Sequence, residues 1–331
     1  METEQRLLFR GSIDLLRVVS AAAVVVLHSV AAPLGNGNNS IPFLTGKILT
    51  VIHALTLWAV PVFFIITGYC LLLKPECNYK YCFLHIRKFV LALFTVGLFY
   101  ALLEEVYSIG TVNVTVVFHA IRNVITGDLW EHMWFVYAMI GVYLVMPVIH
   151  TFIKQEKVGS IVLTAILFAF NIFLPVIREW LPIGVELPFG GYLFYVCVGG
   201  LAARYGIRRW QCVTVSIVGL ISAVFASIHY NGKAAKPTDL LAMCFMALAV
   251  FAIFNCMEIR PSKILLALSN CSWGIYLFHP LFINIALKLL KIDFVSSVPY
   301  IRIPLLAVLV FVFSFALTYL LKKLPIVSNI I

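Results

Sequence analysis

The amino-acid sequence predicts an all-α integral membrane protein, a polytopic bundle of about ten transmembrane helices. Of its 331 residues, 63% are hydrophobic and only 11% are charged, and the mean hydropathy is +1.03. Soluble domains are less apolar, with about half of their residues hydrophobic. Apolar runs recur along the whole chain with short polar breaks, so no stretch is left for a separate soluble core. We therefore expect residues 1–331 to form a single membrane domain.

The apolar runs also predict the topology. Windows of about twenty residues give ten spans, and an even number places both termini on the same side of the membrane. With the N-terminus inside, fifteen Lys and Arg residues fall in inner segments and eight in outer ones, which favours cytoplasmic termini. The predicted spans are 13–32, 47–73, 89–108, 132–151, 159–177, 189–205, 212–229, 239–257, 264–287 and 303–324.

The connection at 109–131 is too polar to span the membrane. Its apolar residues fall at helical spacing, opposite Thr115, His119, Arg122 and Thr126, which predicts an amphipathic helix on the outer face. The apolar residues of this helix are Val114, Val117, Phe118, Ile121 and Ile125.

Other readings of the composition are less favoured. The net charge of +10 comes from Lys and Arg scattered over loops, without a basic run or an RNA-binding motif, so we expect no nucleic-acid partner. The start lacks the basic region and cleavage site of a signal peptide, which predicts that the first helix is retained as an anchor. The eight cysteines have no ligand partners at zinc spacing, so ordinary thiols and no metal site are expected.

The first predicted span carries Asp14, Arg17 and His28. Ionisable groups are costly in a bilayer unless they have partners or a function. Asp14 and Arg17 stand three residues apart, so they can pair at the inner surface, and an interfacial ion pair with no further role is the alternative for these two. His28 lies about 16 Å farther along the axis on nearly the same face, where an imidazole cannot extend to the headgroups. This depth favours a function for His28.

A second imidazole, His279, is expected at a similar depth. Each of the two histidines lies about fifteen residues into its span, and the two spans cross in the same direction. Pro280 follows directly and predicts a kink that frees backbone carbonyls beside the imidazole. His279 is either a packing residue bonded to a neighbouring backbone or hydroxyl group, or a residue with a functional role.

Two further groups of candidates lie near the predicted membrane surfaces. His132 and Trp134 begin the fourth span, which enters from the outside, where they can meet a polar substrate; an aromatic-belt residue with solvated neighbours is the alternative. Arg87 and Lys88, with His85, form the densest positive patch near the third span. This patch is either a topology signal or a site for phosphate groups.

Several common catalytic patterns are absent from the sequence. It has no Gly-x-Ser-x-Gly, Walker, Gly-x-Gly-x-x-Gly or His-Glu-x-x-His motif. Few acids fall within spans, which argues against a two-carboxylate glycosidase site. A histidine-centred site with arginines below it remains.

These residues resemble a known family. Arg10-x-x-x-Asp14-x-x-Arg17 followed by His28 resembles the first helix of the acyltransferase-3 family of bacterial membrane acyltransferases, which has a basic residue and a histidine eleven apart. Further similar stretches follow in the family's order along nearly the whole chain. They are Val60-Pro-Val-Phe-Phe-Ile-Ile-Thr-Gly68-Tyr69, His132-Met-Trp134-Phe-Val-Tyr, Tyr143-Leu-Val-Met-Pro147 and Gly274-Ile-Tyr276-Leu-Phe-His279-Pro280.

The resemblance implies ten transmembrane helices in a bacterial inner membrane and transfer of an acyl group, usually acetyl, from cytoplasmic acyl-CoA to an envelope carbohydrate or lipid-linked saccharide. The length is similar to the short branch, which includes O-antigen and enterobacterial common antigen O-acetyltransferases. Carried over by position, His28 is the catalytic base and Arg17 a donor-binding residue. The chain departs from the family in lacking an acid just after His28 and an Arg-x-x-Arg element near the third helix.

For the remaining candidates we expect supporting roles. Asp14, Arg87 and Lys88 belong to the donor side, where acetyl-CoA acts as co-substrate and no cofactor is bound. His279, Tyr276, His132 and Trp134 are candidates for steadying the acceptor.

Two other classes of function stay open. A transporter or flippase of a lipid-linked glycan would use the same histidines for recognition or proton coupling, although such proteins commonly show two related halves, and none are found here. A membrane domain that senses a ligand without catalysis is the third reading, and the absence of a fused module argues against it.

Overall fold

The computed structural model describes residues 2–35, 42–74, 77–110, 113–179, 191–230, 236–292, 299–325, 327 and 330. These residues form helices and connections and contain no strand, which confirms the predicted all-α class. The helices are α1 (Glu2–Gly35), α2 (Phe43–Thr56), α3 (Ala59–Leu71), α4 (Tyr79–Ala92), α5 (Leu98–Ile109), α6 (Val114–Thr126), α7 (Trp134–Gln155), α8 (Lys157–Phe168), α9 (Leu174–Arg178), α10 (Tyr192–Tyr205), α11 (Arg209–His229), α12 (Pro237–Asn255), α13 (Lys263–Asn284) and α14 (Pro299–Leu321).

Within the described ranges, nine helical segments are long and apolar enough to cross a membrane. They correspond to nine of the ten predicted spans, and several are longer than one helix because short π-helical turns join neighbours, as at Leu93–Gly97 between α4 and α5. The remaining predicted span, 189–205, begins outside the described residues and continues as α10. The side of the membrane on which each terminus lies stays a prediction.

The described residues pack into two compact units, each taken here by itself. Unit 1 comprises Met1–Leu73 and Ile153–Thr318, and unit 2 comprises Lys74–Phe152 and Tyr319–Ile331. The assignment of the whole chain to one domain stays a prediction.

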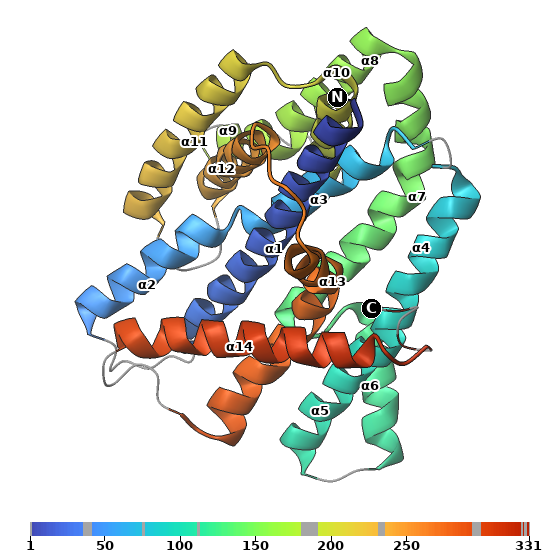
Figure 1. Ribbon diagram of the computed structural model, residues 1–331. Coiled ribbons are helices and arrows are strands. Elements are labelled where there is room, and N and C mark those ends of the chain that lie inside the picture. The colour runs from blue at the N-terminus through green and yellow to red at the C-terminus, as the bar shows by residue number, and fades with distance from the viewer. Residues whose placement is uncertain are drawn as a thin grey trace. The chain divides into compact units, whose positions relative to one another are not determined.

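In unit 1, helix α1 packs against α2, α3 and α13 (Figure 1). Its start is tied to the segment between α12 and α13, because the Ser12 hydroxyl donates to the Met257 carbonyl at 2.6 Å and accepts from the Ile259 amide at 3.3 Å. Gly11 lies against the same segment, and a Cβ added there would meet the Ile259 oxygen at 2.0 Å. These contacts fix the depth of α1 beside α13, and with it the height of the ionisable groups that α1 carries.

Small residues bring α3 and α10 together in the same unit. A Cβ on Gly68 would lie 1.9 Å from the Val196 carbonyl oxygen, and one on Gly199 would lie 2.0 Å from that of Ile65. Glycines at such positions let helix backbones approach closely, which is the usual way that membrane helices pack without a hydrophobic driving force. The family-like stretch that ends at Gly68 and Tyr69 is therefore a packing surface as well as a span.

Unit 2 contains the predicted amphipathic helix, which the structure confirms as α6. Asn113 caps its start, and Gly127 with φ of 80° ends it. Val116, Ala120 and Val124 are buried, whereas the predicted apolar residues Val114 and Phe118 are 71% and 67% exposed. The exposed apolar side suits a helix that contacts lipid.

Candidate active site

The first part of the site is an ion pair that is built into α1. Arg17 Nη1 donates to Asp14 Oδ1 at 3.3 Å, and the same oxygen accepts from Ser269 Oγ of α13 at 2.7 Å. Arg17 Nη2 lies 3.3 Å from Cys70 Sγ of α3. The Asp14 side chain is only 5% exposed, whereas that of Arg17 is 34% exposed. The buried carboxylate therefore holds the guanidinium, and the partly exposed guanidinium is the group that a ligand can reach.

The second part of the site is a pair of imidazoles. The ring centroids of His28 and His279 are 5.1 Å apart and their planes are tilted by 42°. His28 is half-buried and His279 is fully buried. The expectation of similar depth is thus confirmed, and α1 and α13 bring together two histidines that lie about 250 positions apart in the sequence.

Pro280 determines which ring nitrogen of His279 carries the proton. A proline has no amide hydrogen, so the carbonyl of Tyr276, four residues earlier, loses its usual helical donor. His279 Nδ1 lies 2.7 Å from this oxygen and 3.3 Å from that of Ile275. Because a carbonyl oxygen only accepts hydrogen bonds, Nδ1 must carry the proton, and in the neutral ring Nε2 carries the lone pair. The predicted freed carbonyl is present, and the histidine itself is its donor.

An aromatic row leads along α13 to this pair. Trp273 and Tyr276 are stacked, with centroids 5.8 Å apart and planes within 6°, and Tyr276 lies 5.8 Å from His279. Tyr276 is only 3% exposed. These aromatic rings pack beside His279 along α13 and restrict the rotation of its imidazole ring.

The sequence interpretation missed a third histidine, His53 on α2. Helix α2 packs against α1, and the His53 ring stacks on Tyr230 with centroids 5.4 Å apart and planes within 8°. Its Nδ1 is buried and has no hydrogen-bond partner among the described residues. The signal was available, because His53 is an isolated imidazole in an apolar span, as His28 is.

The other predicted residues belong to unit 2. Arg87 and Lys88 are exposed on α4. His132 is 2% exposed and meets the edge of the Tyr100 ring at 5.6 Å between centroids, whereas Trp134 is 43% exposed. The donor role of Arg87 and Lys88 and the acceptor role of His132 and Trp134 stay predictions.

Comparison with known proteins decides the family. Residues 10–323 match the acyltransferase-3 family, which is described as an acyltransferase domain. The chain belongs to this family of membrane acyltransferases. It is also 23% identical over 320 residues to the Bacillus subtilis (strain 168) protein named "Putative membrane-bound acyltransferase YfiQ", covering 87% of this chain and 85% of that protein. No solved structure gives a significant match.

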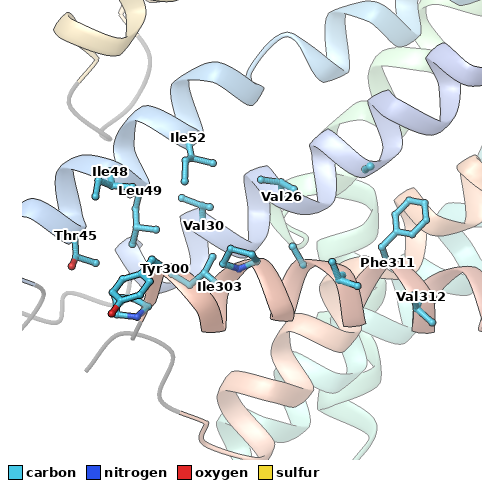
Figure 2. Close-up of a pocket in the computed structure, with 15 residues that line it drawn as sticks. Val26, Val30, Thr45, Ile48, Leu49, Ile52, Tyr300, Ile303, Phe311 and Val312 are labelled. Carbon is cyan, nitrogen blue, oxygen red and sulfur yellow. The ribbon is translucent and has the colours of Figure 1, made fainter. Parts of the chain in front are cut away.

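The acyltransferase also has an apolar cavity in unit 1, which Figure 2 shows between α1, α2 and α14. Its volume is about 450 Å³, and aliphatic and aromatic side chains such as Val26, Ile52 and Phe311 form nearly all of its wall. Val26 and Val30 lie on the face of α1 opposite His28, since two residues turn a helix by about 200°. None of the residues that line this cavity is a histidine, an acid, a lysine or an arginine, and neither His28 nor His279 is among them.

Proposed function

We propose that this membrane acyltransferase is an O-acyltransferase with His28 as its general base. In this proposal it moves an acyl group, by the family's usual donor an acetyl group, from cytoplasmic acyl-CoA to a hydroxyl of an envelope carbohydrate in a bacterial inner membrane. The observation that carries the proposal is the His28–His279 pair, because two imidazoles in contact at the centre of apolar helices are costly unless they have a function.

The reaction needs a base, donors for a developing oxyanion and exclusion of water. His28 takes the proton of the acceptor hydroxyl as the oxygen attacks the thioester carbonyl carbon. A carbon–oxygen bond forms, the carbon–sulfur bond breaks, and the leaving thiolate takes the proton from the His28 imidazolium. An imidazole can accept a proton and then donate it, so it suits both transfers. His279 supports His28 as a neighbour whose protonation state is fixed by Tyr276.

The donor is assigned to the opposite end of the same face of α1. Arg17 precedes His28 by eleven residues, about 16 Å along the axis and three helical turns. A planar guanidinium that is held by Asp14 and partly exposed suits the phosphates of a nucleotide donor. The thioester arm of acyl-CoA then extends along α1 towards His28, while the acceptor enters from the predicted outer side.

The purified protein tests this proposal with acetyl-CoA that carries a radiolabelled acetyl group and with glycan extracted from the host envelope. We expect label in the glycan with the wild-type protein and about a hundredfold or greater loss with His28→Ala, because a positioned base contributes that much. A protein that carries glycan across vesicles without moving label is a transporter and contradicts the proposal.

A further inference from the structure

Two neighbouring helices define the surroundings of His53 on α2. Helix α2 packs against both α1 and α11, and the His53 ring lies stacked on Tyr230 at the end of α11. The stack fixes the plane of the imidazole. It leaves Nδ1 buried and without a hydrogen-bond partner among the described residues.

An unpartnered nitrogen in this position is unfavourable. A buried polar group that makes no hydrogen bond costs about 1–3 kcal/mol, and nearly all such groups in proteins are satisfied by protein, water or ligand. His229, the neighbour of Tyr230, shows the ordinary arrangement, because its Nδ1 is bonded to the Phe225 carbonyl of its own helix at 3.1 Å. His53 lacks such a bond among the described residues, so its Nδ1 can accept a hydrogen bond from a ligand.

The surroundings of His53 are suited to hydroxyl groups. Tyr230 is 4% exposed, and burial together with the nearby Asp239 carboxylate raises the pKa of its phenol, which keeps the phenol neutral. Asp239 is 6% exposed and accepts from the Lys236 amide at the start of α12. An imidazole, a phenol and a carboxylate can each accept a hydrogen bond from a hydroxyl group and so orient it. None of these three groups supplies the positive charge that favours binding of a phosphate group.

His53 lies at the level of His28, and not of Arg17, along α1. Its neighbour Ile52 lines the same cavity as Val26 and Val30, which stand on either side of His28 in α1. Arg17 is eleven residues from His28, about 16 Å along the helix axis, so a hydroxyl group bound at His53 lies nearer to His28 than to Arg17.

We propose that His53, held by its stack on Tyr230, binds a hydroxyl group of the acceptor and orients it towards His28. The ligand class is a polyhydroxylated molecule, and this inference rests on the proposed acyl transfer. His53 therefore determines acceptor affinity, whereas His28 performs the proton transfer.

The test compares three variants in the label-transfer assay. The acceptor is the envelope glycan that receives label from the wild-type protein, and its concentration is expressed as total hexose. His53→Ala should raise the acceptor KM about tenfold and leave kcat and the acyl-CoA KM within about twofold. His53→Asn should restore most of the affinity, because the Asn amide reaches the position of Nδ1. His229→Ala, which removes an exposed imidazole one residue from Tyr230, should behave as wild type.

An unchanged acceptor KM in His53→Ala would overturn the inference, as would a fall in kcat at constant KM or a failure of Asn to restore affinity. His28→Ala, assayed in parallel, separates this result from the proposed function. If His28→Ala is inactive and His53→Ala has a normal acceptor KM, only the role of His53 is wrong. If His28→Ala transfers label at the wild-type rate, the proposed function itself is wrong.

Discussion

Replacing Asp14 by Asn tests how the protein holds Arg17, the arginine that we propose binds the donor. The substitution keeps the shape of the side chain and removes the charge that Arg17 meets at 3.3 Å. A hydrogen bond between charged groups contributes about 1.5–3 kcal/mol, and the 34% exposure of Arg17 places the expected loss at the lower end. We expect about 1.4 kcal/mol, which is a tenfold rise in the acyl-CoA KM with the acceptor KM unchanged.

Two further variants, one on α13 and one on α1, make this test more specific. Ser269→Ala removes the 2.7 Å hydrogen bond to Asp14 but keeps the charge pair, so the acyl-CoA KM should rise by about threefold at most. Ser20→Ala removes a buried α1 hydroxyl that has no hydrogen-bond partner among the described residues, and it should leave both constants unchanged. Steady-state kinetics on detergent-purified protein measures all three. The reasoning is refuted if Asp14→Asn keeps the wild-type acyl-CoA KM, or if Ser20→Ala changes it as much.

Three further outcomes follow from the geometry. Gly68→Ala should lower the midpoint of thermal unfolding, measured by tryptophan fluorescence, because the new Cβ would lie 1.9 Å from the Val196 carbonyl oxygen. Gly141→Ala should raise the midpoint, because no atom lies within 4 Å of the added Cβ and alanine favours a helix more than glycine does. A higher midpoint for Gly68→Ala than for Gly141→Ala would contradict this account of the packing. His279→Phe keeps the volume of the ring but removes both nitrogens, so kcat should fall at least tenfold with normal membrane insertion. Full activity in His279→Phe would show that contact with His28 has no catalytic role.

The sequence was sufficient for the architecture. Long apolar runs can be recognised directly in the sequence, so nine of the spans were predictable. Helix α6 was predictable because its apolar residues recur at helical spacing. The similar depth of His28 and His279 was also predictable, because each lies about fifteen residues into a span and the two spans cross in the same direction, whereas their contact was not. Depth along a helix can be counted from the sequence at 1.5 Å per residue.

Partners across helices were not predictable in the same way. Hydropathy fixes the depth of a residue but not the rotation of its helix or the neighbours that it meets. The contacts of Asp14 with Ser269 and of Arg17 with Cys70 depend on backbone approaches at glycines such as Gly11 and Gly68. His53 was missed for a different reason, since it lies outside the stretches that resemble the family and its stacking on Tyr230 joins two distant spans.

Cells that carry the His28→Ala variant test the central claim most directly. The measurement is the amount of acyl groups on the envelope glycan, determined by mass spectrometry, at matched membrane levels of protein. The account predicts that acylation falls to the level of cells without the gene, while His229→Ala supports wild-type acylation. Normal acylation in the His28→Ala cells would contradict the assignment of His28 as the base.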